Sequence, residues 1–248
     1  MQVALRRRLR WPLPLGPRCC NGRSCARPLD ELGDHWCSCM RSGRVRRRAK
    51  PLERIWARIF REAGCRVLEN VFLRDMGLPG IAAADGRQLE VIATGSPLAQ
   101  AVPLAVDATM VSPLHGTGEP WDRAQVVPGV SLQRAEHSKE GKYPELVDSE
   151  AAQLTTLACE TGGRWSSRCL EVVEQLASAR ARSAPEHMRV SARLAYESRW
   201  WAMLSCTQQD TLAVTLVDDA ILLLNGHDAA EPAVSEVLVD ELHSAHCG

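Results

Sequence analysis

The residue types best suited to metal chemistry near the start of the chain are three cysteines and one histidine: Cys20, Cys25, His35 and Cys39. Their spacing is Cys-x4-Cys-x9-His-x3-Cys. Thiolate and imidazole groups in such a set can close a tetrahedron around one soft divalent ion, and Zn²⁺ is the usual occupant. The neighbouring thiols of Cys19 and Cys37 could substitute for two of these ligands. The spacing therefore predicts a structural zinc site. It does not decide between Cys19 and Cys20, or between Cys37 and Cys39, as ligands.

A second candidate site consists of acidic residues on three successive segments with strand character: Glu69, Glu90 and Asp107. Carboxylates that point inward from neighbouring strands repel one another and are costly to bury, unless a cation such as Mg²⁺ neutralises them. Asp107 is the strongest candidate because apolar residues flank it between Leu104 and Val111. The alternative, an Asp that caps a strand end, stays open for Asp107 and is favoured for Glu69.

Two lysines, Lys139 and Lys142, follow in a charged segment. Metal-dependent phosphodiester hydrolysis needs carboxylates that hold Mg²⁺ and a cation that orients the nucleophile or offsets transition-state charge. The lysines could supply that cation, although each also fits a solvated helix face. His115 and His137 have no partners at a local metal-ligand spacing, so we interpret them as surface histidines.

Charge is distributed unevenly along the chain. Residues 1–50 contain 13 Arg or Lys and 3 Asp or Glu, so they carry a net charge of +10 and the remainder carries −10. A basic arm on an acidic body favours a polyanion as partner, either DNA or RNA. The expected contacts are Arg44, Arg46, Arg47, Arg48 and Lys50. The basic clusters at residues 6–10 and 44–50 could also act as a nuclear import signal. The alternative is that they form a solvated basic face.

Cysteine usage and apolar runs bear on cellular location. Half of the ten cysteines lie between residues 19 and 39, which favours a metal site in a reducing compartment over a disulfide scaffold. The N-terminus lacks the apolar run of a signal peptide, and the longest apolar stretch, residues 220–224, is too short to span a bilayer. We expect an intracellular, nuclear protein without a membrane partner.

The scaffold that must position these groups follows from periodicity. Apolar residues at helical spacing predict helices at 46–63, 165–182 and 188–216, and a charged helix is expected at 131–142. Strand-forming segments occur at 65–73, 87–93, 102–111 and 154–160. The order predicts an α/β fold. We divide the chain into a disordered basic arm (1–18), a zinc knuckle (19–45), an α/β domain (46–183), a helical extension (184–224) and a flexible tail (225–248).

This order of elements, with its acidic residues and a downstream Lys, resembles the PD-(D/E)XK or restriction-endonuclease-like superfamily over roughly residues 50–180. With the preceding knuckle it looks like the C-terminal region of R2-type non-LTR retrotransposon polyproteins. There a zinc knuckle follows the reverse transcriptase and leads into such an endonuclease. Phrases such as Gly33-Asp-His35 and Arg199-Trp-Trp-Ala-Met-Leu204 are also similar to retroelement-derived dinoflagellate proteins.

The resemblance implies a mixed four-stranded sheet flanked by helices, and Mg²⁺-dependent nicking of DNA. Glu90 would stand for the Asp of the PD element, Asp107 for the acidic residue of (D/E)XK, and Glu69 for an accessory acidic residue. The chain departs from the pattern at Leu89, where the family has Pro, and at Thr109, where it has Lys. Lys139 or Lys142 would then have to supply the missing cation.

Two alternatives follow from these departures. If neither lysine serves, the chain is a catalytically degenerate protein that binds nucleic acid without cleaving it. An assembly scaffold is a third interpretation, and it predicts an exposed apolar stripe around Trp200 and Trp201 on the last helix.

Overall fold

The computed structural model describes residues 2–13, 15, 19–98, 102–147 and 149–216. The predicted flexible tail, 225–248, and the end of the predicted helical extension, 217–224, lie outside these residues. Within the described residues, no helix combines the length and the apolar character that crossing a membrane requires.

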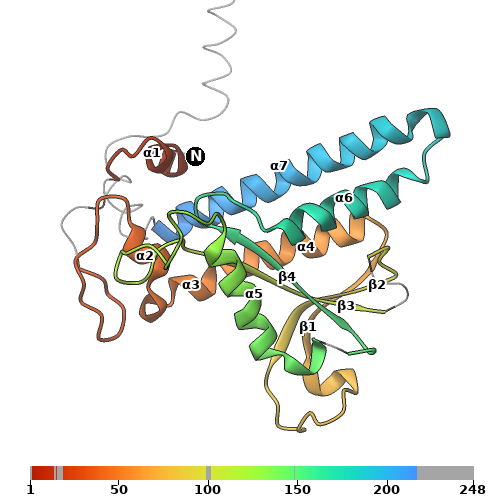
Figure 1. Cartoon of the computed structure of the whole chain (residues 1–248), viewed down its shortest axis with the longest axis horizontal. Helices are drawn as coiled ribbons and strands as arrows, with labels where there is room; N and C mark the ends of the chain where they lie inside the picture. Colours follow the sequence, from red (N-terminus) through yellow and green to blue (C-terminus); the bar gives the residue numbers. More distant parts are fainter. Residues whose placement is uncertain (1, 14, 16–18, 99–101, 148, 217–248) are drawn as a thin grey trace, which may run out of the picture. The chain divides into compact units, whose positions relative to one another are not determined.

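A four-stranded sheet forms the centre of the described chain (Figure 1). Its strands are β1 (Arg66–Phe72), β2 (Gln88–Thr94), β3 (Leu104–Val111) and β4 (Gln153–Glu160), and they lie side by side in that order. The pairs β1/β2 and β2/β3 are antiparallel, whereas β3/β4 is parallel. The sheet is therefore mixed, and the predicted α/β class with a mixed four-stranded sheet flanked by helices is confirmed.

Helices cover both faces of the sheet. The parallel connection from β3 to β4 contains α5 (Val130–Lys142), which packs on these two strands. The other face carries α4 (Ala49–Glu62), α6 (Ser167–Ala181) and α7 (Arg189–Leu216) (Figure 1). The main core lies between that face and these three helices, and burial of its apolar side chains is the main driving force for this packing.

The helix α4 forms because its apolar residues fall on one stripe. Trp56, Ile59 and Phe60 of that stripe are fully buried, as expected for a helix that packs on a sheet. Trp56 meets Trp165 edge to face, with ring centroids 6.2 Å apart. The helix ends before Gly64, whose φ of 97° suits glycine.

The tryptophans of α7 are part of the core. Trp200 is fully buried and its Nε1 donates a hydrogen bond to Oε2 of Glu62, at 2.9 Å. Trp201 packs edge to face on Trp165, with centroids 5.7 Å apart. The exposed apolar stripe required by the assembly-scaffold interpretation is therefore not present at these two residues, and that expectation is wrong.

Short helices build the N-terminal region: α1 (Gln2–Arg8), α2 (Asp34–Ser38), the 3₁₀ turn η1 (Met40–Ser42) and α3 (Arg44–Arg47). The prediction of a disordered arm at 1–18 differs from this structure, because α1 is helical. Arg7 fixes it by pairing with the carboxylate of Asp34 at 2.6 Å and donating to the carbonyl of Leu32 at 2.7 Å. Three more 3₁₀ turns are η2 (Leu73–Met76), η3 (Pro144–Leu146) and η4 (Glu186–Met188).

Candidate functional site

The predicted zinc ligands lie together in space. The ligating atoms of Cys20, Cys25, His35 and Cys39 are all within 4.8 Å of one another. The Cys39 Sγ is 3.7 Å from the Sγ atoms of both Cys20 and Cys25, and the Cys25 Sγ is 3.3 Å from the His35 Nε2. Two thiolates bound tetrahedrally to one zinc ion lie about 3.8 Å apart, given Zn–S bonds of about 2.3 Å. These four residues can therefore hold a zinc ion, as predicted.

The imidazole of His35 is oriented by a contact on its other side. Its Nδ1 lies 3.1 Å from the carbonyl oxygen of Gly116, to which Arg27 also donates at 3.0 Å. A proton on Nδ1 leaves the lone pair of Nε2 facing the thiols, which is the arrangement that a histidine ligand needs. The same carbonyl links the knuckle to the loop that follows β3.

The thiol environments within the cluster differ. The pKa of Cys25 is lowered by the backbone N–H of Arg27, whereas burial raises the pKa of Cys20 to about 11. Because zinc binds thiolates, the deprotonation of a buried thiol such as Cys20 is coupled to metal binding.

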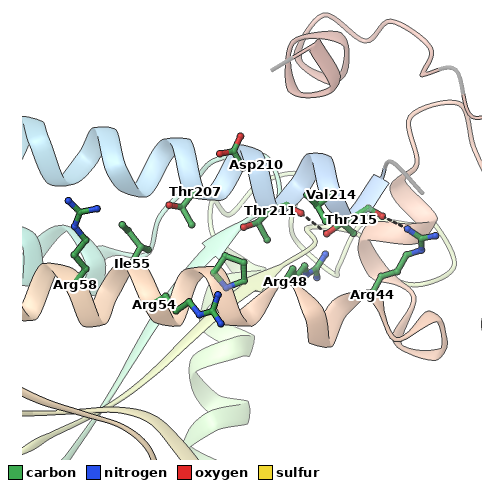
Figure 2. Close-up of a pocket in the computed structure, with 11 residues that line it drawn as sticks. Arg44, Arg48, Arg54, Ile55, Arg58, Thr207, Asp210, Thr211, Val214 and Thr215 are labelled. Carbon is green, nitrogen blue, oxygen red and sulfur yellow. Dashed lines mark hydrogen bonds between the residues drawn. The ribbon is translucent and has the colours of Figure 1, made fainter. Parts of the chain in front are cut away.

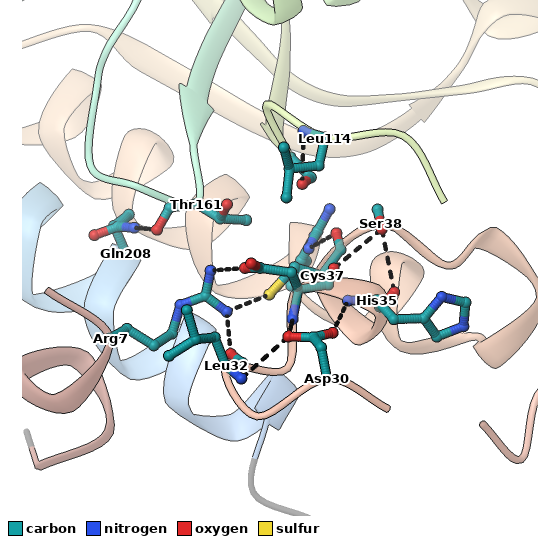
Figure 3. A network of polar contacts seen from close by, with 12 residues as sticks. Arg7, Asp30, Leu32, His35, Cys37, Ser38, Leu114, Thr161 and Gln208 are labelled. Carbon is teal, nitrogen blue, oxygen red and sulfur yellow. Dashed lines mark hydrogen bonds and ion pairs between the residues drawn. The ribbon is translucent and has the colours of Figure 1, made fainter. Parts of the chain in front are cut away.

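The two alternative thiols lie outside the cluster. Cys37 is fully buried, and its Sγ accepts a hydrogen bond of 3.3 Å from Arg7 (Figure 3). Cys19 is exposed. In the same network the Asp30 carboxylate accepts hydrogen bonds from the backbone N–H groups of Leu32 and His35 (Figure 3). The structure therefore places Cys20 rather than Cys19, and Cys39 rather than Cys37, in the cluster.

The acidic residues of β2 and β3 meet where these two strands separate. Their pairing ends at Val91 and Val106, so the next residues outward are Glu90 and Asp107, which lie opposite each other and share a face of the sheet. Asp107 is fully buried. Burial, followed by the charge of Asp107, raises the pKa of Glu90 to about 8. We name this place the β2/β3 opening.

Both predicted lysines reach this opening from α5. The Nζ of Lys139 is 2.5 Å from Oδ1 of Asp107, and the Nζ of Lys142 is 4.0 Å from Oδ2. Two contacts fix the end of α5 to the start of β2 and to the residue before it. The Tyr143 hydroxyl donates to the carbonyl of Gln88 at 2.7 Å, and Arg87 donates to the carbonyl of Lys142 at 2.6 Å. These contacts determine where the lysines stand.

The carboxylates at the opening have unused hydrogen-bonding capacity. Oε2 of Glu90 and both carboxylate oxygens of Asp107 are buried without a hydrogen-bond partner. The ammonium of Lys139 offsets the charge of Asp107, but its direction provides no well-formed hydrogen bond. Buried acceptors of this kind are expensive, so their retention points to a ligand or a functional role.

A glutamate that the sequence did not single out also belongs to this site. Glu53 of α4 is 91% buried, and its pKa is raised by burial and, to a smaller extent, by the charge of Asp107. The Nζ of Lys50 lies 3.5 Å from its carboxylate. The sequence feature that could have identified Glu53 is its position one helical turn before Trp56 and Ala57. This spacing puts the carboxylate on the buried side of the helix.

Glu69 is not brought to the opening. It lies on the exposed surface of β1, where its carboxylate pairs with Arg61 of α4. The third carboxylate near Asp107 is therefore that of Glu53, not that of Glu69.

The predicted basic contact surface is only partly available. Arg44 is buried, with its guanidinium over the ring of Trp36 and a hydrogen bond to the carbonyl of Thr215. Arg48 is also buried and donates to the carbonyl of Cys37 at 2.6 Å. These two side chains are therefore not exposed on a basic surface as predicted, although both border a groove between α4 (Ala49–Glu62) and α7 (Arg189–Leu216). Lys50 is exposed, and the side chains of Arg46 and Arg47 lie outside what the structure describes.

Comparison with protein-family models and with curated proteins finds no match to this chain. The resemblance to an R2-type retroelement region therefore stays a prediction.

Proposed function

We propose that this chain is a metal-dependent DNA endonuclease whose zinc knuckle is structural and helps to hold the nucleic acid. One observation carries the proposal: Glu90 and Asp107 share a buried opening between two strands, with the Lys139 ammonium 2.5 Å from Asp107. Buried carboxylates beside an ammonium form the set of groups that phosphodiester hydrolysis with Mg²⁺ requires.

The donor set fits Mg²⁺ chemically. Carboxylate oxygens are hard ligands of the kind that Mg²⁺ prefers. The opening offers Oε2 of Glu90 and both carboxylate oxygens of Asp107, of which Oδ1 is ion-paired with Lys139. Bound there, Mg²⁺ would polarise a phosphodiester and lower the pKa of a water molecule. Among the described residues, the Cys/His cluster is the only set of three or more potential ligands whose atoms all lie within 4.8 Å of one another. The carboxylates would therefore have to draw closer around an ion.

The side chains at the opening then have distinct roles. Asp107 and Glu90 hold the cation, and Glu53 adds negative charge from the helix side. Lys139 stands where it can donate to a phosphoryl oxygen or orient a water molecule beside Asp107. Lys142, with 43% of its side chain exposed, is better placed to contact the DNA backbone than the reacting atoms.

The sequence resemblance supports the same proposal. The observed order of helices and strands agrees with a restriction-endonuclease-like core, and Lys139 reaches Asp107 from the following helix although Thr109 replaces the usual Lys. Nuclear location and retroelement origin remain expectations that rest on the basic segments and the motifs of the sequence.

A nicking assay on supercoiled plasmid tests the proposal, with Mg²⁺ added or omitted and zinc left in place. We expect Asp107→Asn to slow nicking at least about 100-fold, because it removes a negative ligand while keeping the side-chain shape. Glu69→Gln is the matched control, since this acid lies on a neighbouring strand away from the opening. Nicking by Asp107→Asn at the wild-type rate would contradict the assignment.

A second candidate function is nucleic-acid binding without cleavage. The observation that favours it is the Lys139–Asp107 ion pair itself, which neutralises Asp107 with no metal ion. In that case the wild-type chain would bind plasmid but leave it intact with Mg²⁺ or Mn²⁺, and Asp107→Asn would bind equally well.

A further inference from the structure

A separate groove of about 490 Å³ lies between α4 and α7 (Figure 2). Arg54 and Ile55 line it from α4, and Thr207 and Thr211 line it from α7. Ile55 lies about 160° around α4 from Glu53, at about 100° per residue. The groove therefore opens on a different side of α4 from the β2/β3 opening.

Two buried polar groups at the groove have no hydrogen-bond partner. The hydroxyl oxygen of Thr211 is one, in a side chain that is 96% buried. The Nε of Arg48 is the other, in a residue that is likewise 96% buried. Arg48 donates from Nη1 to the carbonyl of Cys37, a neutral acceptor, so its charge is not offset there. A buried guanidinium with an unused donor is expensive unless an anion meets it.

The charges around the groove have one predominant sign. Four arginines line it, and Asp210 is the single carboxylate among its lining residues. Arg58 is engaged by Glu62 at 3.0 Å, which leaves Arg54 as an exposed cation at the rim. Pro51, Ile55 and Val214 provide apolar walls beside these donors. These donors and walls suit an anionic ligand that carries several acceptor oxygens, and they leave room for an organic body beside them.

We propose that this groove binds a phosphate group, with Arg54 donating at its rim and with the buried donors of Arg48 and Thr211, which have almost no exposed surface, turning toward the phosphate at its base. A phosphate presents several oxygens in a tetrahedral arrangement, so it can accept from donors that approach from different elements. The apolar walls would hold the sugar or other organic part. The phosphate could come from a nucleic-acid backbone or from a small phosphorylated molecule. The proposal does not depend on cleavage at Asp107.

The test is isothermal titration calorimetry, in which inorganic phosphate is added to the zinc-loaded full chain and its dissociation constant is measured. The buffer contains no other phosphate and no Mg²⁺. Thr211→Val should weaken phosphate binding about 5-fold, since it removes one donor and keeps the side-chain shape. Arg54→Gln, at an exposed site that does not threaten folding, should weaken it about 3-fold. Arg180→Gln on α6, away from the groove, is the matched control and should bind as wild type does.

A second titration, with duplex DNA in place of inorganic phosphate, distinguishes a nucleic-acid backbone from a small phosphorylated molecule as the source of the phosphate. If phosphate competes with DNA and both variants weaken DNA binding, the groove holds the nucleic-acid backbone. If both variants lose phosphate affinity while DNA binding is unchanged, the ligand is a small phosphorylated molecule. Either result supports the site. Absence of saturable phosphate binding, or equal binding by wild type, Thr211→Val and Arg54→Gln, overturns it.

Discussion

The Nζ atom of Lys139 lies 2.5 Å from Oδ1 of Asp107, a carboxylate with no exposed surface. The two residues come from α5 and β3, and the fixed end of α5 holds them together. This pair has a consequence for stability as well as for chemistry, because neither charge is well solvated.

Replacement of Lys139 by Met should destabilise the fold by about 3 to 5 kcal/mol, since it leaves a buried carboxylate without its counter-ion. Lys142→Met is the matched control and should change the free energy of unfolding by less than about 1 kcal/mol, because that lysine is more exposed and more distant. Urea denaturation measures both. The double variant Asp107→Asn/Lys139→Met should be more stable than Lys139→Met alone, and equal stability of the two lysine variants would contradict the assignment.

Metal content should distinguish the four clustered ligands from the two other thiols. We expect about one zinc ion per purified chain, and loss of that ion from Cys25→Ser and Cys39→Ser, each of which removes a thiolate. Cys19→Ser and Cys37→Ser should retain it, because neither thiol belongs to the cluster. Mass spectrometry of metal content provides the measurement. Loss of zinc from Cys37→Ser with its fold intact would show that the ligand set is wrong.

Gly22 stands where the loop between Cys20 and Cys25 approaches the backbone after Cys39. A Cβ atom there would lie 2.8 Å from both the carbonyl carbon of Arg41 and the backbone nitrogen of Ser42. Because backbone atoms cannot move aside independently, Gly22→Ala should spread the knuckle and weaken zinc binding about 10-fold. Gly86→Ala is the control, since its Cβ would meet no atom within 4 Å. Competition with a zinc-binding dye measures the change, and equal affinities would refute the close approach.

Glu62 joins α4 to α7 and should make stability depend on acid pH. Hydrogen bonds, first from Arg199 and then from Trp200 and Arg58, lower its pKa from 4.5 to about 2. A lowered pKa in the folded state means that its contribution is present above about pH 4.5 and is lost as pH falls toward 2.

The variant Glu62→Gln tests this directly. We expect its free energy of unfolding at pH 7 to be about 1 to 2 kcal/mol lower than that of wild type. This difference should shrink as the pH falls from 4.5 to 2. Denaturant titrations across that range provide the measurement. A difference that is independent of pH would mean that the carboxylate charge is not what stabilises the contact. Glu174→Gln on α6 provides a control at an exposed acid.

The sequence alone determined the four strands and the long helices, but not the short N-terminal helices α1 and α2. The helix expected at 131–142 is observed at Val130–Lys142, and the strand expected at 154–160 is observed at Gln153–Glu160. These elements follow from local patterns, because helix and strand periods depend on residues that are close along the chain. The zinc ligands could be predicted for a similar reason, since they fall within twenty residues of one another.

Tertiary structure decided which distant residues meet. Sequence order could not show that Glu53 reaches the opening while Glu69 pairs with Arg61 outside it, because the packing of α4 on the sheet fixes both. It could not show that Arg48 is buried, since that depends on how α2 packs beside it and presents the Cys37 carbonyl to its guanidinium. A residue's type sets what its side chain can do, whereas burial and partners depend on segments far away in the sequence.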